Sequence, residues 1–109
     1  MKLNIYGKKN TVVKTYTAES YDLLFGVVED VADAIKLDEL KTGSDAEIMK
    51  LVVSLVARSM GTVKGLLKDI FDGLTDEEIK HTKVKEIAAV LVDVVKYTVV
   101  ELRSFNSKN

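Results

Sequence analysis

Two stretches of the sequence are apolar around most of a helical circumference, and this feature most constrains the fold. In residues 45–60 the polar positions Lys50, Ser54 and Arg58 recur every fourth residue and form one narrow stripe. In residues 83–103 the charged side chains again share one side, and valine-rich apolar residues fill the remainder. A chain of 109 residues has little other structure with which to cover two such helices. We expect one of them at the centre of the domain and surplus apolar surface, which usually marks a partner, on the other. The alternative is that a hairpin and the remaining helices cover both.

The valines of residues 83–103 favour a strand, because β-branched side chains pack well on a sheet. The length of the segment and its single charged side favour a helix, which we predict, with Thr82 as its cap. Ser44 and Glu47 form a capping-box pattern at the start of the other apolar helix.

The rest of the chain predicts shorter elements around these two helices. Alternating apolar residues on both sides of Gly7 to Asn10 predict a β-hairpin, with strands Lys2 to Tyr6 and Thr11 to Tyr16. Gly61 and Gly65 predict a break near Gly61, and Gly73 a helix stop. We therefore predict one domain, 1–109, of the α+β class but mainly α: a hairpin (2–16), helices over 18–36 (capped by Thr17), 45–60, 62–71 and 83–103, and a short capped turn over 75–81.

Composition excludes several classes of protein. The chain has no cysteine, which rules out disulfides and zinc–thiolate sites. Its net charge of −1 makes nucleic acid a poor partner, since phosphate backbones attract basic proteins. The alternating N-terminus does not have the pattern of a signal peptide, and no uninterrupted apolar run is long enough to span a membrane.

The run GLTDEEIKHT contains the only histidine, His81, three residues after Glu78. Glu-x-x-His is a metal-binding spacing in helical bundles, but a di-iron site needs two such motifs, and one histidine cannot supply them. The same residues make a capping box, with Thr75 as N-cap, Glu78 as its partner, and acidic residues at the positive end of the helix dipole. We interpret the run as a capped turn, and we expect no catalytic residue, metal or cofactor.

Two long runs carry a resemblance to a known family. They are MKLNIYGKKNTVVKTYTAESYDLLFGVVEDV and DGLTDEEIKHTKVKEIAAVLVDVVKYTVVEL, and together they cover most of the chain. Their pattern of hairpin, acidic amphipathic helix, capped turn and valine-rich helix resembles the tail assembly chaperones of long-tailed, siphovirus-type bacteriophages of Gram-positive hosts. The resemblance implies a non-enzymatic protein of the host cytoplasm that binds the tape measure protein, keeps it soluble, and is absent from the mature virion.

The family also implies a longer product made by ribosomal frameshifting, which helps to recruit tail tube protein. The chain ends Ser107-Lys108-Asn109, and suitable codons would spell the slippery sequence A-AAA-AAC there. We place the frameshift at these residues as a hypothesis that the gene sequence tests. The alternative function is a structural tail or neck component that stays in the virion.

Surplus apolar surface also leads us to expect self-association. For the partner-binding surface we choose apolar positions on the two apolar helices, although the same residues would serve equally as core. These residues are Val53, Val56, Val92, Val95 and Val99.

Overall fold

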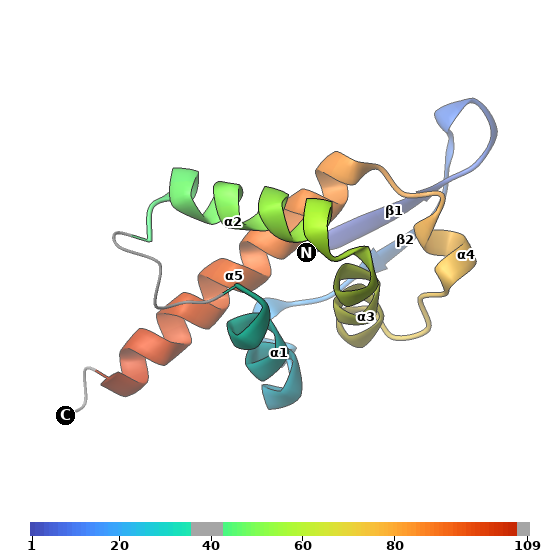
Figure 1. The fold of residues 1–109 in the computed structure, drawn as a ribbon. Helices are drawn as coiled ribbons and strands as arrows, with labels where there is room; N and C mark the ends of the chain where they lie inside the picture. Colours follow the sequence, from blue (N-terminus) through green and yellow to red (C-terminus); the bar gives the residue numbers. More distant parts are fainter. Residues whose placement is uncertain (36–42, 107–109) are drawn as a thin grey trace.

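The structure is a computed structural model that describes residues 1–35 and 43–106. A two-stranded antiparallel hairpin is followed by helices, which confirms the fold class predicted from the sequence (Figure 1). In the described part of the chain, the elements are β1 (Lys2–Tyr6), η1 (Lys8–Asn10), β2 (Val12–Thr17), η2 (Ser20–Asp22), α1 (Phe25–Ile35), α2 (Asp45–Arg58), α3 (Met60–Ile70), α4 (Asp76–Ile79) and α5 (Val84–Asn106). Lys36 and the Ser107–Asn109 frameshift hypothesis lie outside the described residues.

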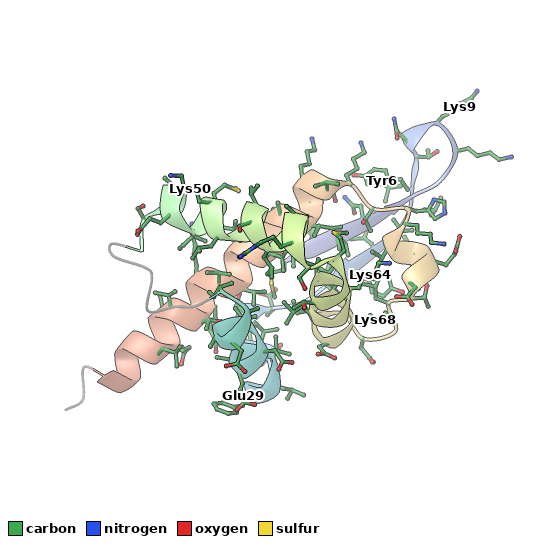
Figure 2. All side chains as sticks on the ribbon, viewed as in Figure 1. Tyr6, Lys9, Glu29, Lys50, Lys64 and Lys68 are labelled. Carbon is green, nitrogen blue, oxygen red and sulfur yellow. The ribbon has the colours of Figure 1, made fainter. Side chains whose placement is uncertain are left out.

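The hairpin buries one face of β1. Leu3 and Ile5 alternate with polar residues and are buried, as the period of two requires. A bulge between Ile5 and Tyr6 shifts the register. Gly7 fits closely here, because a Cβ at this position would lie 2.7 Å from Val13 Cγ1. Positive φ falls on Lys9 (56°) and its neighbour in η1, and Figure 2 shows Lys9 at the tip of the hairpin, away from the helices.

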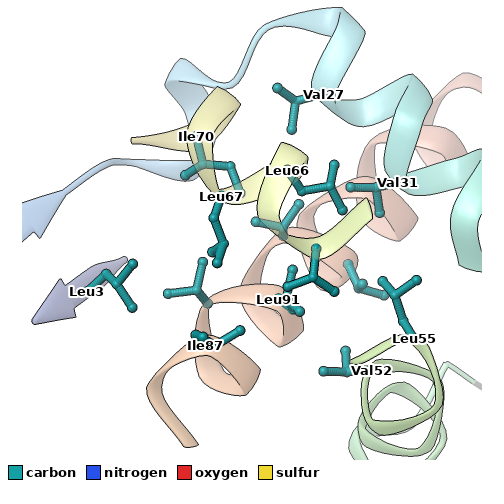
Figure 3. Packing of buried hydrophobic residues seen from close by; sticks show 14 of the residues in the cluster. Leu3, Val27, Val31, Val52, Leu55, Leu66, Leu67, Ile70, Ile87 and Leu91 are labelled. Atoms are coloured by element: carbon teal, nitrogen blue, oxygen red, sulfur yellow. The ribbon is translucent and has the colours of Figure 1, made fainter. Parts of the chain in front are cut away.

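Helix α5 is the centre of the domain. It contacts β1, α1 and α2, so that apolar side chains around much of its circumference are covered. Figure 3 shows Ile87 and Leu91 of α5 among buried residues from β1 and from helices α1, α2 and α3. Its buried apolar residues are Ile87, Val90, Leu91, Val94, Val95 and Val99. The prediction of a helix over 83–103 is confirmed, because packing on all these neighbours outweighs the strand preference of valine.

Helix α1 begins later than the predicted start at residue 18. Thr17 is the last residue of β2, paired with Lys2, and does not cap a helix. The N–H of Ala18 donates to the carbonyl oxygen of Met1 at 3.0 Å, so strand pairing continues past the predicted cap. The buried face of α1 consists of Val27, Val31 and Ile35.

The break between α2 and α3 falls at Ser59, two residues before the predicted glycine. Ser59 has φ −146° and ψ 69°, and its hydroxyl donates to Thr62 Oγ1 at 2.6 Å inside the first turn of α3. Gly61 lies within α3, where no atom outside its own helix and chain neighbours approaches its missing side chain within 4 Å. The glycines thus predicted that the helix breaks in this region, but the residue at the break is Ser59 and not Gly61.

At α2 the predicted N-cap Ser44 is confirmed, while the Glu47 side chain bonds one residue earlier than the capping box places it, and the predicted cap of α5 differs. The Ser44 hydroxyl accepts from the Glu47 N–H at 3.3 Å, and the Glu47 carboxylate accepts from the Gly43 N–H at 2.8 Å. The Thr82 hydroxyl instead donates back to the Ile79 carbonyl oxygen at 2.7 Å. Thr82 therefore closes the turn after α4 and is not the cap of α5.

Candidate functional site

The short helix α4 has the capping box predicted from the sequence. The Thr75 hydroxyl accepts from the Glu78 N–H at 3.1 Å, and the Glu78 carboxylate accepts from the Thr75 N–H at 3.1 Å. Two residues of β2 also reach this carboxylate: Tyr16 donates to it at 2.6 Å, and the Lys14 ammonium lies 3.3 Å away. Glu78 therefore joins α4 to the hairpin.

His81 lies on the surface beside an acidic side chain. Its Nε2 is 3.6 Å from Glu77, and 55% of the side chain is exposed. Glu78, the other residue of the Glu-x-x-His spacing, is engaged by the hairpin and by its own cap. Among residues 1–35 and 43–106, no three histidine or acidic side chains group as metal ligands do. The geometry of the run is that of a helix start.

Two carboxylates of α4, Glu78 and Asp76, have lowered pKa values for the same structural reasons. The Tyr16 hydroxyl, followed by the Thr75 N–H and Lys14, holds the pKa of Glu78 below its ordinary value. Lys68, 2.6 Å from Asp76, lowers the pKa of that carboxyl. Both shifts arise from partners that stabilise the charged form on an exposed surface.

The start of α5 is tied to β1 in a similar way. The Glu86 carboxylate accepts from the Tyr6 hydroxyl, and this bond raises the pKa of Tyr6. The same carboxylate accepts from the Asn4 N–H at 3.3 Å. The Tyr6 N–H donates to the carbonyl oxygen of His81 at 2.8 Å. Glu86 thus attaches the hairpin to the start of α5.

The five valines chosen as a partner surface divide between surface and core. Val53 on α2 is 56% exposed. Val56 and Val92 are half-buried and pack against the core. Val95 and Val99 on α5 are 2% and 8% exposed, so in this fold they belong to the core. Of the five predicted residues, only Val53 exposes most of its side chain and could contact a partner through it.

An open apolar groove runs along α2 beside Val53. Met49, one helical turn earlier, is 44% exposed, and the two side chains lie in one row because they are four residues apart. The depression has a volume of about 530 Å³ and is lined by Ala46, Met49, Lys50, Val53 and Ser54. We call these residues the α2 groove. Met49 was not among the residues predicted to bind a partner. Its position four residues before Val53, on the same face of the helix, is the sequence signal that could have identified it.

A second apolar surface lies at the beginning of α1, inside the range 18–36 that was predicted as one helix. Tyr21, Leu24 and Phe25 are 73%, 76% and 74% exposed. The predicted helix over 18–36 would include Leu24, but α1 begins only at Phe25, after η2. We call these three residues the α1 corner.

The exposed row that continues from the α1 corner is acidic. Phe25, Glu29 and Asp33 follow one another at four-residue spacing and are all exposed. In the described residues, no lysine or arginine forms an ion pair with Glu29 or Asp33. A shallow depression of about 380 Å³ beside this row includes Asp30 and Asp69 in its lining.

Within the described ranges, no helix combines the length and the apolarity that crossing a membrane requires. Neither the comparison with protein-family models nor the searches of curated proteins and of solved structures finds a match to this chain.

Proposed function

We propose that this chain is a non-enzymatic phage tail assembly chaperone that binds the tape measure protein and keeps it soluble. The observation that carries the proposal is the α2 groove, an apolar surface that the rest of the described fold leaves open. The resemblance of the hairpin, capped turn and valine-rich helix to tail assembly chaperones supplies the class of client.

The groove has the chemistry that an amphipathic client helix requires. An amphipathic client helix lays apolar side chains spaced at one helical turn on a hydrophobic surface, and Met49 and Val53 offer an exposed apolar row on which they can pack. Methionine also adapts its shape to different partners, because its side chain is unbranched and flexible. Lys50 at the edge of the groove would meet acidic residues beside the apolar stripe of a client.

The proposal includes the remaining steps that the resemblance implies. A frameshifted longer form would recruit tail tube protein, and the chaperone would act in the host cytoplasm and leave before the virion is complete. These steps need no catalytic residue.

Co-expression with the neighbouring tape measure gene tests the proposal. The wild-type protein should keep the tape measure protein in the soluble fraction and co-purify with it. Val53→Glu should abolish both effects, because it places a charge in the groove. The matched control is Val84→Glu, on a valine that is 68% exposed at the start of α5 and distant from the groove in sequence. An insoluble tape measure protein in the presence of the wild-type chain would contradict the proposal.

A structural tail or neck component is the second candidate, and the hairpin favours it. Residues of β2 are exposed except for the half-buried Tyr16, so its outer edge is open to another strand. Mass spectrometry of purified virions separates the two functions. The chaperone should be absent from virions, whereas a structural component would be present in stoichiometric amount.

A further inference from the structure

We propose that the outer edge of β2 is a docking site for an extended, acidic segment of a partner protein, which adds to the hairpin as a third strand. The edge consists of the main-chain groups of Thr15 and Thr17, with the exposed lysines of the hairpin beside them. This inference does not rest on the proposed function, because it uses no residue of the α2 groove.

The other edge of the sheet is closed by the chain itself. On β1 the Asn4 N–H donates to the Glu86 carboxylate at 3.3 Å, and the Tyr6 N–H donates to the carbonyl oxygen of His81 at 2.8 Å. Both N–H groups therefore point away from β2, toward the start of α5 and the turn before it. A further strand thus has its place beside β2.

The two outward amides of β1 fix which residues of β2 face the partner. Successive N–H groups along a strand point to opposite sides, so Leu3 faces β2, where it pairs with Tyr16. The residues on either side of Tyr16, Thr15 and Thr17, direct their N–H and C=O groups away from β1. The N–H of Ala18 again donates across the hairpin, as this alternation requires.

These outward groups are accessible. Within the described residues, β1 is the element that packs extensively on β2, and both Thr15 and Thr17 are exposed. Among residues 1–35 and 43–106, neither threonine makes a main-chain hydrogen bond to a residue outside the hairpin. Two donors and two acceptors are left to water, and a strand laid beside β2 would pair with all four.

The charge of the hairpin selects an acidic partner. Residues 1–17 contain four lysines, Lys2, Lys8, Lys9 and Lys14, and no aspartate or glutamate, although the whole chain has a net charge of −1. Lys14 pairs with Glu78, and no carboxylate of the described residues pairs with the other three lysines. Figure 2 shows Lys9 reaching away from the molecule at the hairpin tip. Acidic side chains on the added strand would supply the missing partners, and opposite charges on neighbouring strands stabilise their pairing.

The same lysines oppose the pairing of two copies through this edge. Two β2 strands side by side would bring together two hairpins that each carry four lysines and no acid. Like charges on neighbouring strands destabilise a sheet, and edge lysines commonly prevent such pairing. The edge therefore favours a strand of opposite charge over a second copy.

Hydrogen exchange of the full chain, followed by NMR at single residues, tests the proposal. The probe is a capped synthetic peptide in which valine and threonine alternate and glutamate occupies both ends, so that acid reaches the lysines in either strand direction. At saturating peptide, exchange of the Thr15 and Thr17 amide hydrogens should slow by about tenfold or more, because they become hydrogen-bonded. Exchange at Met49 and Val53 in the α2 groove should not change.

Two altered peptides separate strand addition from simple charge attraction. Methylation of every amide nitrogen in the valine–threonine segment keeps the charges but removes the main-chain donors, and should abolish the protection. Replacement of the glutamates by lysine keeps the donors but reverses the charges, and should weaken binding by about tenfold or more. Equal protection by either altered peptide would overturn the proposal.

Variants of the hairpin test the same contact from the protein side, with affinity measured by fluorescence anisotropy of labelled peptide. Thr15→Pro removes the outward N–H and leaves the bonds to β1, because proline is tolerated on an edge strand where the N–H faces solvent. It should bind the glutamate peptide about tenfold more weakly, whereas Thr15→Val, which keeps the main-chain groups, should bind as the wild type does. Lys8→Glu with Lys9→Glu should lose affinity for the glutamate peptide and gain affinity for the lysine peptide.

Circular dichroism would verify that the variants are folded, and the methylated peptide keeps the test decisive if Thr15→Pro is not. Unchanged exchange at Thr15 and Thr17 in millimolar glutamate peptide would overturn the proposal. Protection of these amides that rises with protein concentration in the absence of peptide would also overturn it, because a second copy would then occupy the edge. Equal binding by folded Thr15→Pro and Thr15→Val would place the contact away from the edge.

Discussion

Helices α2 and α5 have similar sequence patterns and different places in the fold. Both are apolar around most of their circumference. Helix α5 packs against β1, α1 and α2 and leaves only its end residue Val84 and Val100 among its large apolar side chains strongly exposed in the described residues, whereas α2 keeps Met49 and Val53, in its middle, in solvent. The difference teaches that an all-round apolar pattern identifies a buried helix only where enough neighbours reach it. In a small domain the second such helix is left with an open face.

The largest expected effect is on the covered helix. Leu91 on α5 is 1% exposed, so Leu91→Ala should lower the free energy of unfolding by about 2–5 kcal/mol, through lost burial and the cavity left behind. Urea denaturation followed by circular dichroism measures it. Val100→Ala on the exposed side of the same helix is the control and should change the free energy by no more than about 0.5 kcal/mol. Equal effects of the two would break the comparison.

A smaller effect is expected at the cap of the open helix. Ser44→Ala removes the hydroxyl that accepts from the Glu47 N–H, and should lower the free energy of unfolding by about 1 kcal/mol. Ser44→Gly should lower the free energy of unfolding by only about a few tenths of a kcal/mol, since glycine is tolerated at an N-cap. Thermal denaturation of the two variants measures the difference. If alanine and glycine behave alike, the hydroxyl does not cap α2.

Acid should weaken the attachment of the hairpin to α4, which Glu78 makes. Because the folded pKa of Glu78 lies below its ordinary value of 4.5, the folded state binds fewer protons than the unfolded state as pH falls. Its contribution to stability is therefore present above that ordinary value and is lost as pH falls through the lowered folded value. The stability of the wild type should fall more than that of Glu78→Gln between about pH 6 and about pH 3.

Urea denaturation at each pH gives this comparison. Asp76, whose pKa Lys68 lowers, should contribute in the same direction, so Glu78→Gln with Asp76→Asn should show still less acid dependence. Parallel pH profiles for the wild type and both variants would contradict the role given to these carboxylates.

The smallest stability effect is expected in the α2 groove. Val53→Ser should change the free energy of unfolding by no more than about 0.5 kcal/mol, because the side chain is 56% exposed. A loss above about 2 kcal/mol would place Val53 in the core and remove the contrast between the two helices. The groove would then no longer be a candidate for binding.

Structural features that depend only on residues close together in the sequence could be predicted. The Ser44 cap and the Thr75–Glu78 capping box follow from side chains three residues apart, and the buried pair Leu3 and Ile5 follows from alternation along one strand. Each depends on local backbone geometry that the residues themselves set. The run GLTDEEIKHT was interpreted correctly as a capped turn for this reason.

Features that depend on contacts between distant segments were missed. Strand pairing with β1 carries β2 to Thr17, and α1 begins only at Phe25, with Leu24 exposed just before it. The burial of the five valines predicted to bind a partner also depends on such distant contacts. Val95 and Val99 became core and Val53 surface, although their local sequence contexts are alike.

The sequence by itself determined that two helices would be apolar nearly all round, and it left open whether the rest of so short a chain would cover both. Only the tertiary structure decided that α5 is covered and that α2 carries the open groove. The physical reason is that apolarity is a property of each residue, whereas burial depends on which neighbours pack against it, and those neighbours come from distant parts of the chain.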